Sequence, residues 1–266
     1  MSAQPSGRPA EAPVLSEIAD GAARITLNRP DKRNALSLET MLALKTALRE
    51  ASAAPSVRAI VIAGNGPAFS AGHDLAEMVG REPDFYQELF DECTQLMTLI
   101  HELPQPVIAR VHGVATAAGC QLVASCDLAI AAEQATFATP GVRIGLFCST
   151  PMVAVSRAVG RKRSLQMLLT GQAIDAHTAA DWGLINAVVT ADRLDAAVAD
   201  LIAAIEAASP VTVGIGKRAF YDQVDLDESS AYEVTKAVMA ANAEIADAQE
   251  GICAFLDKRR PVWTRD

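Results

Sequence analysis

Apolar segments of strand character alternate with amphipathic helical segments along the first two thirds of this chain. Val57–Ala63, Pro106–Val111 and Asp127–Ala132 are nearly continuous apolar runs, which is typical of parallel strands that are buried on both faces. Between them, Ser37 to Ala53 and Asp84 to Leu103 each carry apolar residues on one helical face. This alternation predicts an α/β fold with a mostly parallel sheet.

The two ends of the chain depart from this pattern. Val14–Ile18 and Ala23–Asn28 flank an Asp-Gly pair, which predicts a β-hairpin. From Asp192 onward the sequence is helical apart from breaks near Ser209-Pro210 and Gly251. The sequence therefore divides into a disordered tail, an α/β core and a helical C-terminal region, over residues 1–13, 14–205 and 206–266.

Composition excludes several classes of function. Half of the 266 residues are hydrophobic, which allows a sizeable core, and the net charge of −9 argues against a nucleic-acid partner. No apolar run reaches the ~18 residues of a membrane span, and no targeting signal is visible. The five cysteines form no C-x-x-C pair, so we expect neither a disulfide framework nor a metal site. These features predict a cytoplasmic protein without a membrane partner.

Common catalytic motifs are missing from the sequence. It contains no G-x-G-x-x-G after a strand, no P-loop, no G-x-S-x-G and no H-E-x-x-H, which argues against dehydrogenases, P-loop ATPases, α/β-hydrolases and zincins. A nucleophilic pair of Cys148 with a histidine stays open, although a structural role for this cysteine is favoured.

Four segments in a fixed order carry a family resemblance. They are Asn28–Leu36, Phe69–Leu75, Val111–Ile130 and Glu250–Arg259. From about residue 14 to residue 261, the chain resembles the crotonase (enoyl-CoA hydratase/isomerase) family. The resemblance implies a ββα spiral core over residues 14–205. It also implies that the helices of residues 206–266 build trimers, which are often paired into hexamers.

The resemblance also implies an oxyanion hole for a thioester carbonyl. It places one donor on the backbone N–H of His73 and the other on that of Ala118. Independently, Ala117-Ala118-Gly119 opens a predicted short helix, whose free N–H groups and dipole favour an anion. Such donors stabilise the charge that develops on the carbonyl oxygen in the transition state. The alternative is that these small residues only let a helix pack closely on a strand.

Coenzyme A is implied as part of the substrate, with no covalently bound cofactor. The resemblance places the adenine near the backbone of Ala71 and Gly72 and assigns Met239 to a contact made from a neighbouring subunit. Lys258 matches a position near the nucleotide phosphates, although a cation there also complements a helix dipole. The other residues assigned to this ligand are Arg29, Lys32, Arg33, Asp74 and Leu75.

The chain departs from the family at both catalytic glutamates, whose positions hold Gln121 and Gly141. An amide does not exchange protons near neutral pH and glycine has no side chain, while each positioned acid or base contributes about 10²–10⁴-fold. We therefore expect weak hydration of 2-enoyl thioesters and some recovery when both positions become glutamate. The segment Pro140–Pro151 resembles the branch called enoyl-CoA hydratase domain-containing protein 3, and naphthoate synthases also have glycine at the second position.

Three hypotheses remain open from the sequence. The first is an enzyme that acts on an acyl-CoA through the oxyanion hole with a non-standard base. The second is a non-catalytic acyl-CoA binder or scaffold, and the third is a conventional hydratase whose glutamates lie in a shifted register. Gln121 is expected to touch substrate as a hydrogen-bond partner, and the His73 side chain is expected to face solvent. Arg143, Cys148 and Ser149 are expected to border the acyl pocket.

Overall fold

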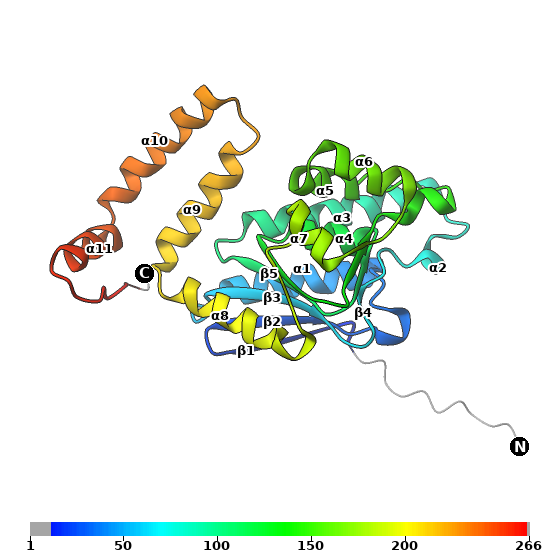
Figure 1. Ribbon diagram of the computed structural model, residues 1–266, viewed down its shortest axis with the longest axis horizontal. Coiled ribbons are helices and arrows are strands. Elements are labelled where there is room, and N and C mark those ends of the chain that lie inside the picture. Colours follow the sequence, from blue (N-terminus) through cyan, green and yellow to red (C-terminus); the bar gives the residue numbers. More distant parts are fainter. Residues whose placement is uncertain (1–11, 265–266) are drawn as a thin grey trace, which may run out of the picture.

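The larger of two β-sheets lies in the middle of the α/β core, with helices on both of its faces (Figure 1). The computed structural model describes residues 12–264, in which this sheet has the strand order β1-β2-β3-β5-β7-β10. The edge strand β1 pairs antiparallel with β2, and every following pair is parallel. The strands are β1 (Val14–Ala19), β2 (Ala22–Leu27), β3 (Ala59–Gly64), β5 (Val107–Val111), β7 (Leu128–Ala132) and β10 (Ala187–Val189).

A smaller sheet of short strands stacks beside the first, with the order β4-β6-β8-β9. In three successive units, β3-β4, β5-β6 and β7-β8, the first strand lies in the larger sheet, the second lies in the smaller sheet, and helical segments follow. This arrangement is the predicted ββα spiral. Its short strands are β4 (Ala68–Ser70), β6 (Val114–Thr116), β8 (Thr136–Ala138) and β9 (Ile174–Asp175).

Helices α1 to α8 cover the two sheets. The first begins as predicted, because Ser37 Oγ accepts a hydrogen bond from the Thr40 N–H at the start of α1. Met41, Leu44 and Leu48 then point into the main core, which they share with the central strands. The helices of this part are α1 (Leu38–Ala53), α2 (Leu75–Met78), α3 (Pro83–Glu102), α4 (Ala118–Ser125), α5 (Pro151–Val159), α6 (Arg161–Thr170), α7 (Ala176–Trp182) and α8 (Leu194–Glu206), with 3₁₀ turns η1 (Pro30–Lys32), η2 (Pro140–Ile144) and η3 (Ala191–Arg193).

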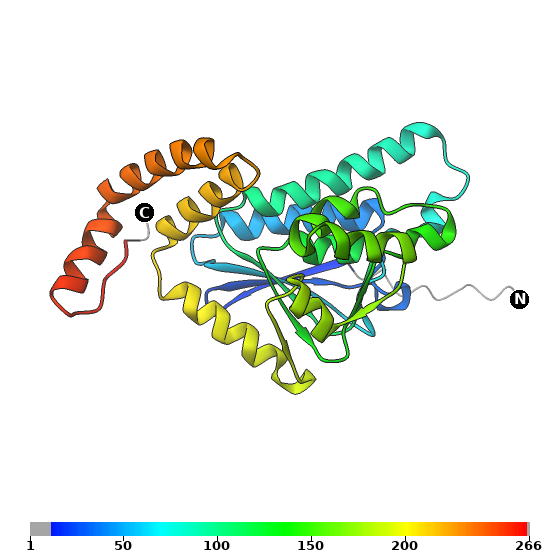
Figure 2. The ribbon, with the colours of Figure 1, turned by 45° about the horizontal axis from the view of Figure 1, so that its top comes forward.

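The C-terminal helices extend away from the core. In both views α10 (Glu228–Glu244) and α11 (Ala246–Leu256) lie apart from the sheets (Figures 1 and 2). The preceding helix, α9 (Pro210–Gln223), is tied to the core by a buried ion pair. Lys217 Nζ donates to Asp127 Oδ2 at 2.6 Å, and the Tyr221 hydroxyl donates to Asp127 Oδ1 at 2.8 Å. Asp127 therefore has a structural role, since it joins α9 to the start of β7.

The structure confirms the predicted hairpin, the parallel strands and the two long helices. The tail predicted for residues 1–13 lies outside the described residues except for Ala12 and Pro13, and the division near residue 206 stays a prediction. Between residues 12 and 264, no single helix is long and apolar enough to cross a membrane, although α8 with η3 and α9 meet that test together as a pair bent by 102°.

Candidate functional site

A cavity of about 670 Å³ opens between the loop after β4, the start of α4 and the segment that follows β8. Three of the residues predicted for catalysis, His73, Ala118 and Gly141, line it. So do Arg143, Cys148 and Ser149, which the sequence places at the acyl pocket. The remaining lining residues are Ala71, Leu75, Phe90, Ala117, Pro140, Ile144, Leu146, Phe147, Thr150 and Pro151.

Gly72 allows the two proposed oxyanion segments to meet. Its φ is +87°, and a Cβ on it would lie 2.8 Å from the Ala117 Cβ and 3.1 Å from the Ala118 nitrogen. A larger residue would therefore be strained and would push the segments apart. This close approach brings the backbones of His73 and Ala118 to the same cavity.

The N–H groups of His73 and Ala118 are not used by the neighbouring backbone pairing. A parallel bridge joins Leu36 to His73, and in it the Leu36 N–H donates to Gly72 O while the Asp74 N–H donates to Leu36 O. That pattern does not involve the N–H of His73. Ala118 is the first residue of α4, so its N–H has no acceptor within the helix. The N–H groups of His73 and Ala118 are therefore both available to donate to a ligand oxygen in the cavity.

Strain at Ala117 sets the direction of α4. This residue has φ 50° and ψ −119°, a backbone conformation that residues other than glycine rarely adopt. The Ala117 N–H donates to Ala138 O at 2.9 Å and so fixes the turn. As a result, the N-terminus of α4 faces the cavity, where a helix dipole favours negative charge.

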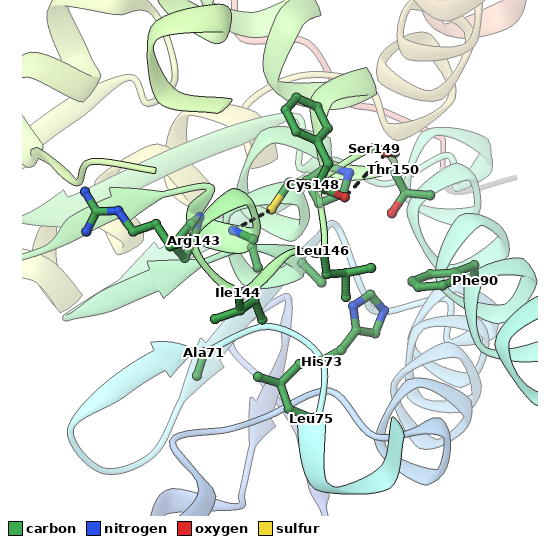
Figure 3. Close-up of a pocket in the computed structure, with 16 residues that line it drawn as sticks. Ala71, His73, Leu75, Phe90, Arg143, Ile144, Leu146, Cys148, Ser149 and Thr150 are labelled. Carbon is green, nitrogen blue, oxygen red and sulfur yellow. Dashed lines mark hydrogen bonds between the residues drawn. The ribbon is translucent and has the colours of Figure 1, made fainter. Parts of the chain in front are cut away.

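The position predicted to match the second family glutamate is filled by the chain itself. A Cβ on Gly141 would lie 2.0 Å from Leu146 O and 2.8 Å from Cys148 Sγ. The segment is held in this fold because the Leu146 N–H donates to Gly141 O at 3.0 Å and the Gly141 N–H donates to Cys148 Sγ at 3.4 Å (Figure 3). A side chain at position 141 has no room in this conformation, which argues against the expected recovery of hydration by glutamate; that recovery stays a prediction.

The position predicted to match the first family glutamate holds a buried amide. Gln121 is 4% exposed, and Cys93 Sγ donates to its Oε1 at 3.8 Å. It is not among the residues that line the cavity. No aspartate or glutamate of residues 12–264 lines the cavity either. In this conformation, the cavity wall provides no carboxylate for general acid–base catalysis.

The His73 side chain points inward, which corrects the expectation that it faces solvent. Figure 3 shows its ring between Leu146 and Phe90, and its edge contact with Phe90 has a centroid distance of 5.4 Å. Burial lowers the pKa of this imidazole to about 4. The ring is therefore neutral at neutral pH.

Several residues assigned to coenzyme A are engaged with each other. Arg29 Nη2 pairs with Asp74 Oδ2 at 2.9 Å, and Arg29 Nη1 donates to Ala35 O. Asp74 also caps the following turn, since its Oδ1 accepts from the Ala76 N–H at 3.3 Å. Lys32 and Arg33 are exposed nearby. These contacts join the loop around η1 to the loop that carries His73.

Met239 and Lys258 are not brought to this cavity by their own chain. Met239 is 73% exposed on α10, and Lys258 follows α11. Both views place these helices at the opposite end of the molecule from β4 and α2 (Figures 1 and 2). Their assignment to the ligand stays a prediction that requires a second subunit.

Sequence reasoning missed part of the cavity wall. Phe90 follows Leu89 directly in α3, so the helical periodicity that identified the buried face does not mark it. Ile144, Leu146 and Phe147 belong to an irregular segment that has no periodic signal. The Cys148 nucleophile hypothesis gains no support, because burial raises the pKa of this thiol and its hydrogen-bond partner is the Gly141 backbone.

Comparison with known proteins decides the family. Residues 17–266 match the enoyl-CoA hydratase/isomerase family. The chain belongs to this family. It is 49% identical over 253 residues to enoyl-CoA hydratase domain-containing protein 3, mitochondrial, from Danio rerio, with 94% of this chain and 87% of the relative covered. This similarity supports the predicted branch of the family.

Solved structures of family members confirm the crotonase fold. A crystal structure of an enoyl-CoA hydratase from Mycobacterium smegmatis matches with a TM-score of 0.93 and 47% identity, covering 95% of this chain and 99% of that one. The human enoyl Coenzyme A hydratase domain-containing protein 3 matches with a TM-score of 0.92 and 44% identity, covering 94% of this chain and 100% of that one.

The predicted cytoplasmic location is contradicted. The Danio rerio relative is named a mitochondrial protein, and its counterparts from Rattus norvegicus and Homo sapiens carry the same name. The prediction depended on the lack of a visible targeting signal, which is weak information about location.

Proposed function

We propose that the cavity binds the acyl part of a coenzyme A thioester and stabilises negative charge on the thioester oxygen. One observation carries the proposal: the contact of Gly72 with Ala117 and Ala118 brings the N–H groups of His73 and Ala118 to one cavity. Preorganised backbone donors of this kind contribute about 3–4 kcal/mol each to acyl-transfer chemistry. An enolate formed next to the thioester carbonyl needs the same stabilisation.

The proposed chemistry differs from ordinary hydration. Gln121 is turned toward Cys93 and the place of the second glutamate is filled by Leu146 O, so the chain offers no pair of carboxylates to activate water. This arrangement also disfavours the conventional hydratase with shifted glutamates, since no carboxylate of the described chain lines the cavity.

The same observation favours a second candidate function, a binder of acyl-CoA that does not turn it over. Crotonyl-CoA separates both candidates from a conventional hydratase, and proton exchange then separates the two candidates from each other. Incubation with stoichiometric protein, followed by chromatography of the thioester, should show hydration well below a kcat/KM of about 10⁴ M⁻¹s⁻¹. Exchange of the α-protons of butyryl-CoA with deuterium would identify an enzyme that forms an enolate. Tight binding without exchange would identify the non-catalytic binder.

We also propose that the C-terminal helices mediate self-association into trimers or hexamers. Large apolar side chains are exposed there: Met239 is 73% exposed, Phe255 83% and Leu256 71%. Large apolar side chains exposed in one region of a chain are candidates for an interaction surface. A neighbouring subunit would also bring Met239 and Lys258 toward a cavity that their own chain leaves without them.

Substitution of Ala118 tests the oxyanion hole. Ala118→Pro removes the N–H donor at the first position of α4, and its ring also crowds Ala117 and Gly72 and disturbs the start of the helix. Ala118→Gly is the matched control, because it keeps the donor. We expect the proline variant to bind butyryl-CoA at least tenfold more weakly than the glycine variant in calorimetry, with both still folded by circular dichroism. Equal affinity of two folded variants would refute the assignment.

A further inference from the structure

Two hydroxyl groups hold the peptide unit that joins Ala71 to Gly72. At one end of this unit, the Gly72 N–H donates to Ser70 Oγ at 3.3 Å. At the other end, Thr116 Oγ1 donates to the carbonyl oxygen of Ala71 at 3.1 Å. A peptide unit is planar, so contacts at both ends fix its orientation. This unit lies immediately before the one that contains the His73 N–H, on the loop that borders the cavity (Figure 3).

The peptide unit that contains the His73 N–H is held from behind. The Leu36 N–H donates to the carbonyl oxygen of Gly72 at 2.7 Å. The carbonyl and the N–H of a trans peptide point in opposite directions, so this hydrogen bond turns the His73 N–H away from Leu36. The direction of this proposed donor therefore depends on two consecutive peptide units, those from Ala71 to His73.

Thr116 belongs to the segment that carries the other proposed donor. It is the last residue of β6, and Ala118 begins α4 two residues later. The hydroxyl of Thr116 thus links the segment of Ala118 directly to the loop of His73. The close packing of Gly72 on this turn, where a Cβ would lie 2.9 Å from Thr116 O, only resists compression. A hydrogen bond also resists separation, because it weakens outside a narrow range of distance.

The Ser70 hydroxyl is itself fixed in place. Ser70 is fully buried, and its Oγ donates to Asn34 O at 2.9 Å while it accepts from the Gly72 N–H. The backbone of Ser70 also lies against the first turn of α4, since a Cβ on Gly119 would lie 2.3 Å from Ser70 O. Neither Ser70 nor Thr116 lines the cavity, so these hydroxyls act on the loop and not on a ligand.

We propose that the Thr116 hydroxyl is a positioning group that sets the separation of the two backbone donors, while Ser70 holds the opposite end of the same peptide unit. The inference rests on the proposed function, because these donors are the ones assigned to the thioester oxygen. Backbone donors stabilise an oxyanion only over a short range of distance, about 2.7–3.1 Å. A loop that is free to turn between Ala71 and Gly72 loses part of this interaction, while the rest of the ligand site is unchanged.

Two ligands measure the carbonyl interaction separately from all other contacts. Butyryl-CoA has the carbonyl oxygen and the thioether S-butyl-CoA lacks it, so the ratio of their dissociation constants in calorimetry reports on the donors. Thr116→Val replaces the hydroxyl by a methyl group. It should lower the preference of the parent for butyryl-CoA about two- to tenfold, the usual worth of one neutral hydrogen bond. Thr116→Ser keeps the hydroxyl and should keep most of the preference.

Thr98→Val is the matched control. The Thr98 hydroxyl also donates to a backbone oxygen at 3.1 Å, but it lies on α3 and outside the cavity, so its loss should leave the ratio unchanged. Infrared spectra of bound, isotope-labelled butyryl-CoA give a second readout. The carbonyl band should lie at lower frequency with the parent and Thr116→Ser than with Thr116→Val, because a better placed donor polarises the carbonyl more strongly.

The outcomes separate this inference from the function on which it rests. If the parent shows no preference for butyryl-CoA and no band shift relative to water, the proposed function fails and the inference fails with it. If Thr116→Val keeps the ratio and the band of the parent, or if Thr116→Ser loses them equally, the role of the hydroxyl is overturned while the thioester site stands. Hydrogen exchange of the parent does not depend on the folding of any variant. The Gly72 amide should exchange much more slowly than an unstructured amide, and exchange at the unstructured rate would overturn the proposal.

Discussion

Gly141 is the position where one added methyl group should have the largest local effect on this site. In Gly141→Ala the new Cβ would start 2.0 Å from Leu146 O, whereas real Cβ atoms do not approach closer than 3.0 Å. The carbonyl would therefore have to retreat by about 1 Å, a distance set by standard contact radii. That movement strains the turn in which the Leu146 N–H donates to Gly141 O.

The expected cost follows from these two effects. Overpacking a filled site costs about 1–3 kcal/mol, and weakening the turn hydrogen bond adds about 0.5–1.5 kcal/mol. We expect Gly141→Ala to lower the free energy of unfolding by about 2–4 kcal/mol, which corresponds to a melting temperature lower by about 4–16 °C for a domain of this size.

Thermal unfolding followed by circular dichroism, with urea titration at 25 °C, measures this change. Gly216→Ala is the matched control, because a Cβ there meets nothing within 4 Å and the residue lies inside α9. Alanine at such a position should stabilise the helix by about 0.8–1 kcal/mol. A Gly141→Ala variant as stable as the parent would refute the packing derived for this segment. Hydration of crotonyl-CoA gained by Gly141→Glu would refute it as well, since the carboxylate needs the space that Leu146 O fills.

Three further predictions concern other parts of the chain. Lys217→Met leaves Asp127 as a buried charge without its cation and should cost about 3–5 kcal/mol in urea unfolding; a loss under about 1 kcal/mol would show that the pair does not anchor α9. The pKa of His73, read by NMR, should lie near 4, below the value of about 6.5 in the unfolded chain. Since the unfolded chain then binds a proton that the folded chain does not, the stability should fall by about 3 kcal/mol as the pH drops from 6.5 to 4; a measured pKa near 6.5 would contradict the burial of the ring. Sedimentation at micromolar concentration should show an assembly of subunits, and a 28.0 kDa monomer would contradict the proposed role of the C-terminal helices.

Local sequence was sufficient to predict the main strands and helices of the fold. The apolar runs at β3, β5 and β7 can be predicted as strands from the sequence, because strands that are buried on both faces show no alternation of apolar and polar residues. Ser37 marks the start of α1 because a capping side chain acts on its own backbone neighbours. The short strands β4 and β6, at three residues each, carry no such signal. Each pairs with a strand that is distant in the sequence, so these strands form only when the spiral fold brings their partners together.

Some features of the candidate site were likewise predictable from the sequence, and others depended on the tertiary structure. The sequence by itself located the small-residue segments at His73 and Ala118, since residue identity and order are local facts, and its resemblance to the family predicts that Gln121 and Gly141 stand where the family has glutamates. Only the tertiary structure decided that Leu146 O fills the place of the missing carboxylate and that the His73 ring turns inward against Phe90. Both outcomes depend on how an irregular segment folds back on itself and on which helix packs over it. Contacts of that kind are set by the filling of space between distant residues, which periodicity does not encode.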